Sequence, residues 1–254
     1  MQRNSIMRIS VCMATYNGGK YLREQVDSIL NQDLSAYPDA ELEIVVSDDG
    51  STDDTITILE SYKDDRIKVY QHKCHRQHRY NKAAFACTEN FGYAMDKATG
   101  DFIFLSDQDD IWYPWKIERQ LSVLLNNGGG LSACAFDCGY TPEKLYAKEA
   151  YEPLRGFRLR PRYRFYGFSI CVTRSELKYI MPMPNIPYHD NFITYVECFR
   201  GMLPEENIIR ESCAFHRFTG QHNVSNLKNN TPFIIRNYQR VKLLFIALYR
   251  SLLR

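Results

Sequence analysis

The chain has no long hydrophobic run, no marked excess of charge of either sign and no C-x-x-C motif. None of its apolar stretches reaches the roughly 18 residues that a membrane span needs, and the first residues, MQRNSIMRIS, lack the apolar core of a signal peptide. The net charge of +2 gives no electrostatic footprint for nucleic acid. The eight cysteines form no C-x-x-C pair, so we interpret them as reduced core residues of a cytoplasmic protein.

The first half of the chain alternates between short apolar runs and segments with helical spacing. The four runs predict strands, and the apolar residues after each run recur at the spacing of a helix, as in Leu22, Val26 and Ile29. This alternation predicts right-handed crossovers and an α/β fold with a Rossmann-like, mostly parallel central sheet. Because the runs are continuously apolar, we expect helices on both faces of that sheet. The predicted strands are 8–14, 41–47, 66–70 and 101–106.

Polar clusters follow three of these strands. They are TYN (15–17), SDDGS (47–51) and SDQDD (106–110). Because the carboxyl ends of parallel strands meet at one edge of a sheet, where ligands of open α/β sheets bind, we expect the three clusters to meet at one rim.

The SDQDD cluster places carboxylates at 107, 109 and 110. If the chain stays extended past Ser106, the side chains of Asp107 and Asp109 point the same way. Like charges this close repel one another unless a cation lies between them. A hard cation with oxygen ligands, Mn²⁺ or Mg²⁺, would serve, bridging to substrate phosphates. The alternative is that the acids are solvated turn residues or helix caps before Trp112.

Three ordered motifs resemble those of a known family. VCMATYNGGKYLREQVDSILNQ, IVVSDDGSTDDT and ATGDFIFLSDQDDIWYPWKIE are similar to segments of the nucleotide-sugar-dependent glycosyltransferases of family 2. That resemblance implies the GT-A fold. It resumes at 166–225, where YGFSICVTR, PYHDNF and HRFTGQHNVS resemble bacterial rhamnosyltransferase-like members. We therefore expect one glycosyltransferase domain over 1–254, with a nucleotide-sugar-binding half (8–125), an acceptor and catalytic half (126–230) and a C-terminal amphipathic helix (231–254).

The resemblance assigns nucleotide contacts to the first two polar clusters. It places Thr15 and Tyr16 at the base and ribose, with Asn17 in the same turn. Asp48, or its neighbour Asp49, would accept a hydrogen bond from the pyrimidine N–H, which favours UDP- or dTDP-sugars. The alternative for the two acids is a turn and N-cap role before the following helix.

The same resemblance makes Asp107 the ribose- or sugar-side acid and Asp109 the direct metal ligand. Asp110 would orient the turn or contact the donor sugar. His222 would complete the metal shell as a neutral imidazole, or bind phosphate when protonated. His216 is the alternative histidine, because it lies where related enzymes carry a tyrosine-arginine pair, with His216 in place of the tyrosine.

Sugar transfer also needs a group that removes the proton of the acceptor hydroxyl. A positioned carboxylate contributes about 10² to 10⁴ in rate as a general base, and one direct displacement inverts the sugar. The PYHDNF segment offers Asp190, at the position where the family's acidic motif begins a helix, with His189 as an orienting neighbour. The alternative is an ordinary helix N-cap.

The segment HKCHRQHRYNKAAF carries several cations before the third predicted helix. Arginine matches diphosphate geometry better than lysine does, so Arg79 is a candidate for the donor phosphates. The histidines suggest zinc, but their spacing from Cys74 fits no structural zinc pattern. A phosphate-facing loop and a plain solvated loop both remain open.

Two basic stretches concern the acceptor. LRGFRLRPRYR (154–164) interleaves arginine with aromatics, and the amphipathic 233–254 segment carries cations beside a broad apolar face. Such a helix lies on an anionic membrane, packs on the core or pairs with a second copy. We expect a metal-dependent inverting glycosyltransferase of the bacterial cytosol, acting on a glycan or lipid-linked acceptor of surface polysaccharide and peripheral to the inner face of the cell membrane if the helix binds lipid. The alternatives are a nucleotidyltransferase, although no Gly-rich phosphate loop follows the first strand, and a non-catalytic nucleotide-binding or scaffold protein.

Overall fold

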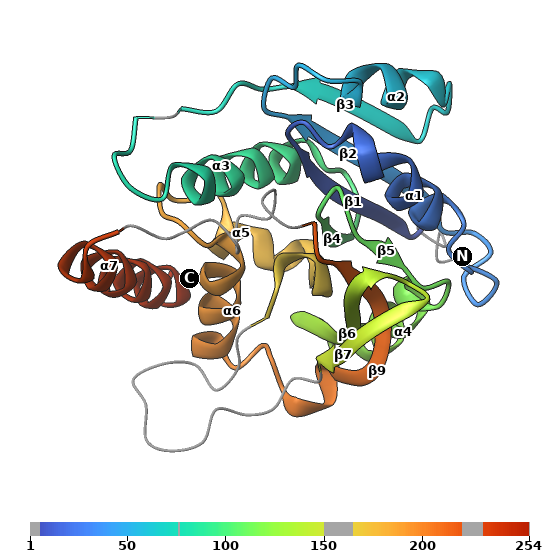
Figure 1. Cartoon of the computed structure of the whole chain (residues 1–254). Coiled ribbons are helices and arrows are strands. Elements are labelled where there is room, and N and C mark those ends of the chain that lie inside the picture. The colour runs from blue at the N-terminus through green and yellow to red at the C-terminus, as the bar shows by residue number, and fades with distance from the viewer. Residues whose placement is uncertain (1–5, 76, 150–164, 220–230, 254) are drawn as a thin grey trace.

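The computed structural model describes residues 6–75, 77–149, 165–219 and 231–253. Its first half is a parallel sheet in the order β3-β2-β1-β4, as predicted (Figure 1). Crossover helices connect these strands, and each predicted strand and helix is present. The strands are β1 (Arg8–Thr15), β2 (Glu41–Asp48), β3 (Ile67–Gln71) and β4 (Phe102–Ser106). The helices are α1 (Gly19–Leu30), α2 (Thr55–Ser61), α3 (Lys82–Lys97) and α4 (Lys116–Asn126).

Side-chain alternation along the strands divides the core into two layers. On β1, Val11 and Met13 point into a cluster with α1, α2 and α4, whereas Cys12 points into a cluster with α3. Successive residues of a strand face opposite sides of the sheet, so a continuously apolar strand buries both faces. The expectation of helices on both faces is confirmed.

The second half extends the same sheet in the order β4-β8-β6-β9-β5, with β7 paired to β6. These pairings are antiparallel except for β6 with β9, so the sheet becomes mixed beyond β4. The added strands are β5 (Ile111–Trp112), β6 (Leu131–Thr141), β7 (Lys144–Glu149), β8 (Ile170–Thr173) and β9 (Ile208–Arg217). The pairing of β5 with β9 brings the end of β9 against the chain just after the SDQDD cluster.

Short helical turns and three α-helices complete this half. The 3₁₀ turns are η1 (Gly167–Ser169), η2 (Arg174–Glu176) and η3 (Glu205–Asn207). The helices are α5 (Leu177–Ile180), α6 (His189–Arg200) and α7 (Phe233–Ser251). Figure 1 shows α7 packed beside α6 at one edge of the molecule.

The C-terminal helix α7 has one buried side and one exposed side. Leu243 and Ala247 are buried in the α3–α6 layer, and the Arg250 guanidinium donates to the carbonyl oxygens of Met181 and Pro182 at 2.7 and 2.9 Å. Within the described ranges, no helix combines the length and hydropathy needed to cross a membrane.

Candidate active site

The ends of β1 and β2 are joined by side-chain hydrogen bonds. The Thr15 hydroxyl donates to Oδ1 of Asp48 at 2.8 Å, and Oδ2 of Asp48 accepts from the Ser51 backbone N–H at 2.8 Å. Thr15 and Asp48 are both buried, so their polar groups hold the rim together. Asp49 accepts from the backbone N–H of Cys74 at 2.8 Å, which links the rim to the segment after β3. The nucleotide contacts expected of these three residues stay predictions.

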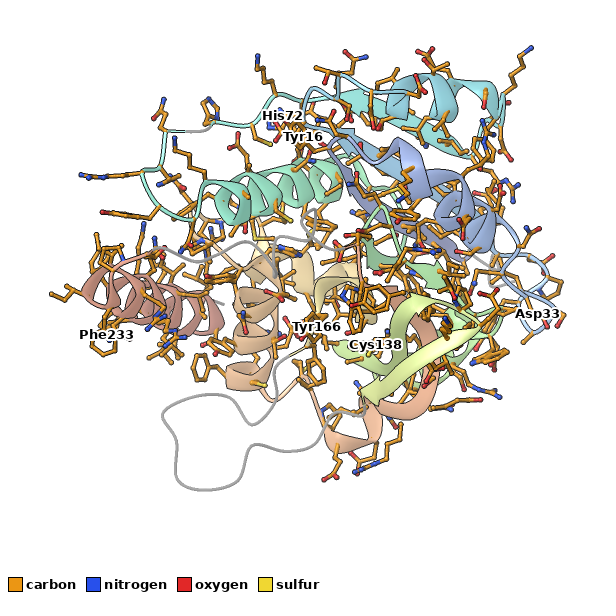
Figure 2. All side chains as sticks on the ribbon, in the orientation of Figure 1. Tyr16, Asp33, His72, Cys138, Tyr166 and Phe233 are labelled. Atoms are coloured by element: carbon orange, nitrogen blue, oxygen red, sulfur yellow. The ribbon has the colours of Figure 1, made fainter. Side chains whose placement is uncertain are left out.

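The turn after β1 is held by its neighbours. Asn17 has a left-handed φ of 49°, its N–H donates to the Ser51 hydroxyl at 2.8 Å, and its side-chain oxygen accepts from the Thr52 N–H at 2.8 Å. Oε1 of Gln108 accepts a hydrogen bond from the backbone N–H of Tyr16 at 2.9 Å. Nε2 of Gln108 donates a hydrogen bond to the Tyr16 carbonyl oxygen at 3.2 Å. Tyr16 follows β1 directly and is 47% exposed (Figure 2), and its expected contact with the base and ribose stays a prediction.

The chain bends at 108 and 109 instead of staying extended past Ser106, because Gln108 turns toward Tyr16. The bend leaves Asp110 fully buried. Its Oδ1 lies 2.8 Å from Nδ1 of His216 and accepts from the Arg217 N–H at 3.2 Å. Its Oδ2 is buried and has no hydrogen-bond partner among the described residues.

Burial and mutual repulsion shift the pKa values of Asp107 and Asp109 upward. Burial, reinforced by the charges of Asp110 and Asp109, raises the pKa of Asp107 well above its usual value. Burial and the Asp110 charge raise the pKa of Asp109 to about 7. Burial lowers the pKa of His216, but the Asp110 carboxylate outweighs it and raises this pKa to about 9. One imidazolium lies beside three carboxyl groups. The cluster therefore has fewer positively charged groups than acidic ones.

This donor set fits a hard divalent cation. Oδ2 of Asp110 is buried without a partner among the described residues, and carboxylate oxygens are the ligands that such a cation prefers. His222, expected to complete the metal shell, lies outside the described residues, as does the whole basic stretch 154–164.

The expected base lies at the start of α6. Asp190 is the second residue of the helix, preceded by Tyr188 in a left-handed conformation with φ of 69°. Its charge adds to the burial and the other acids that raise the pKa of Asp107, so Asp190 lies near enough to act on that carboxyl group. Burial raises the pKa of the Cys87 thiol on α3, and the negative charges of Asp107, Asp190 and Asp49 raise it further. The rim and the start of α6 therefore converge near Cys87.

His189 is a buried neighbour of this base. Its ring packs on Phe91 at a centroid distance of 4.2 Å, and a side chain at Gly167 would lie 2.6 Å from its Nε2. Burial lowers the pKa of His189 to about 3, so the ring is neutral at physiological pH. The orienting role expected of His189 stays a prediction.

The structure does not bring Arg79 to the carboxylates. Arg79 is exposed, and its guanidinium lies 5.5 Å from the centre of the Tyr80 ring; within the described ranges no contact joins it to the acidic cluster. Its expected role at the donor phosphates stays a prediction.

The sequence did not reveal the contact of Gln108 with Tyr16. It also did not show that the end of β9 packs against the acidic cluster. Gln108 stands inside the SDQDD motif, but only its contact with Tyr16 reveals its role. Arg217 is buried, donates from Nε to the carbonyl oxygen of Asp109 at 3.2 Å and pairs with Glu24 at 2.7 Å. The histidine-arginine pair therefore holds the back of the acidic cluster.

Comparison with known proteins identifies the family. The model of glycosyl transferase family 2 matches residues 10–177. The chain belongs to this family. The expected GT-A fold is confirmed: the chain superposes on S. aureus TarS 1–349 in complex with UDP with a TM-score of 0.62 and 18% identity, over 98% of this chain and 67% of that one.

Two curated relatives from Bacillus subtilis are similar in sequence. The putative glycosyltransferase EpsE is 32% identical over 124 residues, which is 48% of this chain and 40% of EpsE. The putative teichuronic acid biosynthesis glycosyltransferase TuaG is 26% identical over 248 residues, covering 92% of this chain and 89% of TuaG. The match to EpsE thus spans less than half of that relative, whereas the match to TuaG spans most of it.

Proposed function

We propose that this family 2 protein transfers a sugar from a nucleotide-sugar to a hydroxyl group, with a divalent cation and with inversion at the sugar. The observation that carries the proposal is the acidic cluster at the end of β4, where Asp110 keeps one buried oxygen without a partner among the described residues. The cluster lies on the rim where ligands of open α/β sheets bind, beside the nucleotide-side turn of Tyr16.

Asp107 and Asp109 would hold Mn²⁺ or Mg²⁺, with His222 as the further ligand that the family resemblance implies. When bound, such a cation stabilises the negative charge that grows on the leaving nucleoside diphosphate. His216 neutralises part of the Asp110 charge from behind, and the backbone N–H of Arg217 donates a hydrogen bond to the same carboxylate and helps to keep the turn in place. Asp107 also reaches the ribose or the donor sugar.

The general base is Asp190. Its place in the first turn of α6 favours the ionised carboxylate, because the positive end of the helix dipole lies there. The Asp190 carboxylate accepts the proton of the acceptor hydroxyl. At the same time the hydroxyl oxygen attacks the anomeric carbon, and the nucleoside diphosphate leaves. A single displacement inverts the configuration.

The donor is a UDP- or dTDP-sugar. Asp49 or Asp48 accepts a hydrogen bond from the imide N–H of the pyrimidine. The turn of Thr15, Tyr16 and Asn17 contacts the base and ribose. The similarity to TarS in complex with UDP supports the proposal at the level of the fold. Arg79 reaches the diphosphate if the segment after β3 moves toward the donor.

The acceptor is a glycan or lipid-linked saccharide of bacterial surface polysaccharide, and α7 contacts the inner face of the membrane. The similarity to TuaG supports this acceptor class. Side chains spaced three and four residues apart form an apolar stripe on the outer side of α7, between 45% and 80% exposed. The stripe consists of Ile234, Tyr238, Val241, Phe245, Leu248 and Leu252. The helix has four cations and no acids, which suits an anionic lipid surface.

Titration calorimetry with UDP and Mn²⁺ tests the donor site. We expect Mn²⁺-dependent UDP binding that Asp109→Asn abolishes and that Asp96→Asn, an exposed acid of α3, leaves unchanged. Asp190→Asn should still bind UDP but release none from UDP-sugars. Unchanged binding in Asp109→Asn rejects the metal site, and pyrophosphate release from nucleoside triphosphates would instead support a nucleotidyltransferase.

Co-sedimentation with vesicles tests the helix. The Tyr238→Glu/Phe245→Glu variant should lose binding to anionic vesicles, whereas Leu145→Glu, at an exposed apolar residue of β7, should retain it. A chain that binds no vesicles and forms a dimer that the same two substitutions dissociate would show that the stripe is a homodimer interface.

A further inference from the structure

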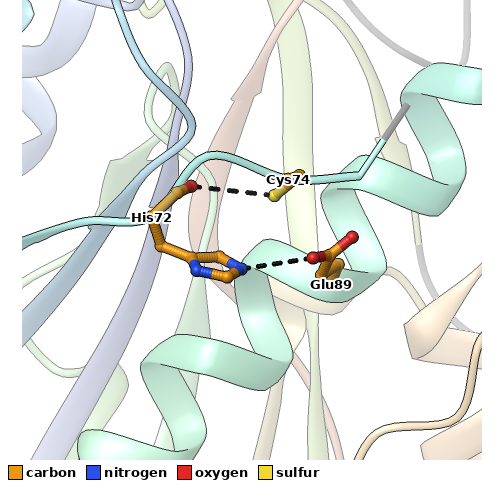
Figure 3. A group of neighbouring side chains, drawn as sticks. All are labelled: His72, Cys74 and Glu89. Carbon is orange, nitrogen blue, oxygen red and sulfur yellow. Dashed lines mark hydrogen bonds and ion pairs between the residues drawn. The ribbon is translucent and has the colours of Figure 1, made fainter. Parts of the chain in front are cut away.

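A second group of metal-ligating side chains lies away from the acidic cluster. His72 and Cys74 follow β3 directly, and Glu89 projects from α3 toward them (Figure 3). One ligand atom from each residue lies within 4.8 Å of the other two, and Nε2 of His72 is 3.3 Å from Oε1 of Glu89. The sequence spacing of His72 and Cys74 did not indicate a zinc site. The third residue of the group, Glu89, comes from the following helix and is not close to them in the sequence.

These distances are close to those of an occupied site. Zinc bonds of about 2.0 to 2.3 Å in a tetrahedron place neighbouring ligand atoms about 3.5 Å apart. The His72–Glu89 pair already has this separation, so only the Cys74 sulfur has to approach by about an ångström. That is a side-chain adjustment and needs no change of fold.

The three residues are positioned by their surroundings. The His72 ring stacks on Tyr93 at 4.1 Å with an interplanar angle of 6°, and its backbone N–H donates to the Asp48 carbonyl oxygen at 2.8 Å. Cys74 is 5% exposed, and its backbone N–H donates to Asp49. Preorganised ligands lose little conformational entropy when a metal binds.

His75 holds the carboxylate from the outside. Its backbone N–H donates to Oε2 of Glu89 at 2.9 Å, and its ring Nδ1 lies 2.6 Å from Oε1. Burial raises the pKa of Glu89, but the hydrogen bonds from His75 outweigh it and lower this pKa, so the carboxylate is ionised. Outer groups of this kind orient the ligands of metal sites.

We propose that His72, Cys74 and Glu89 bind a zinc ion, with His75 positioning the carboxylate. A set with one sulfur, one imidazole nitrogen and one carboxylate suits Zn²⁺, whereas the all-oxygen cluster of Asp107 and Asp109 suits Mn²⁺ or Mg²⁺. A neutral imidazole, a thiolate and a carboxylate balance the charge of the ion. Binding releases the thiol proton to solvent.

The ion would join the segment after β3 to α3. Because Cys74 donates to Asp49 and His72 to the Asp48 carbonyl, the metal would stabilise the part of the rim that faces the nucleotide. This consequence rests on the proposed function, but the zinc site itself does not.

Cobalt spectroscopy tests the site without any donor or acceptor. Chelator-treated full-length protein receives one equivalent of Co²⁺, followed by Zn²⁺. We expect a thiolate-to-cobalt charge-transfer band that Zn²⁺ removes. Cys74→Ser should lack the band, and Cys198→Ser, a matched thiol on α6, should keep it. Asp109→Asn should also keep it, because that substitution affects only the carboxylate site.

Two further variants test the site independently in case Cys74→Ser misfolds. Glu89→Gln should weaken Co²⁺ binding tenfold or more, and His75→Asn should weaken it about 10- to 100-fold, with unchanged far-ultraviolet circular dichroism. The proposal is overturned if the wild type gives no charge-transfer band, if Cys74→Ser retains it, if Glu89→Gln binds Co²⁺ as tightly as the wild type, or if Asp109→Asn abolishes the band.

Discussion

His216 and Asp110 form a buried ion pair that connects the end of β9 to the acidic turn after β4. Nδ1 of His216 lies 2.8 Å from Oδ1 of Asp110, and the two side chains are 15% and 0% exposed. The partners are far apart in the chain, and they meet because β5, which follows Asp110 directly, pairs with β9. The pair places one positive charge behind three carboxylates.

His216→Asn should lower the free energy of unfolding by about 3 kcal/mol at pH 6, because a buried carboxylate loses its partner. The folded-state pKa of His216 is raised to about 9, so its stabilisation is fully present below the unfolded pKa and is lost as the pH rises through about 9. Urea unfolding of metal-free protein at pH 6 and pH 10 measures the difference.

The Asp110→Asn/His216→Asn double variant is the control for that experiment, since it leaves no unpaired charge. It should recover part of the lost stability at pH 6. An equal cost of His216→Asn at both pH values would contradict the ion pair.

Mn²⁺ affinity should depend on pH through Asp109. Because the folded-state pKa of Asp109 is raised to about 7 and the metal binds only the ionised carboxylate, affinity should fall about tenfold for each pH unit below 7. In metal-free protein the raised pKa has the opposite effect on folding: stability decreases as the pH rises from the unfolded pKa to about 7. Mn²⁺ titrations between pH 5.5 and 8 test this, and constant affinity over that range would argue against Asp109 as a ligand.

Gly18→Ala should disturb the rim through Gln108. A β-carbon at this position would lie 2.2 Å from Oε1 of Gln108, the atom that accepts from the Tyr16 N–H. We expect a loss of about 1–3 kcal/mol in unfolding free energy and weaker UDP binding. In a Gln108→Ala background the same substitution should cost much less, and a double-mutant cycle measures this coupling. Additive effects would show that Gly18 acts independently of Gln108.

Glu197→Gln should stabilise the protein at alkaline pH. Burial, with the nearby Glu176, raises the pKa of Glu197 to about 9. The folded state therefore retains a proton that the unfolded state releases, and stability falls as the pH rises from the unfolded pKa toward 9. Glutamine removes this penalty, which amounts to about 5 kcal/mol at pH 8.5 and about 1 kcal/mol at pH 5.

Urea unfolding at those two pH values measures the effect of Glu197→Gln. Glu205→Gln, at an exposed acid paired with Arg210, is the matched control and should change stability by less than about 0.5 kcal/mol at either pH. A destabilised Glu197→Gln at pH 8.5 would mean that the carboxylate is ionised in the folded state.

The amino-acid pattern predicted the sheet of the first half because local physics decides it. Apolar runs such as 8–14 and 101–106 can be buried only as central strands, and helical spacing after each run requires crossover helices. The rule that parallel strands end at one edge then placed the turns of Asn17, Asp48 and Asp109 on one rim. The hydrogen bonds between those turns confirm that they meet.

The contacts between distant side chains follow from the packing of the folded chain. The pairing of β5 with β9 joins His216 to Asp110, the bend at Gln108 joins Tyr16 to the acidic turn, and the approach of α3 joins Glu89 to His72. No local pattern encodes these contacts, because each depends on how packed elements lie relative to one another. The residue pattern alone was therefore enough to predict the family, the sheet of the first half and the acidic motif. Packing decided the partners and the protonation of those acids, because burial and neighbouring charges, not residue type, shift a pKa.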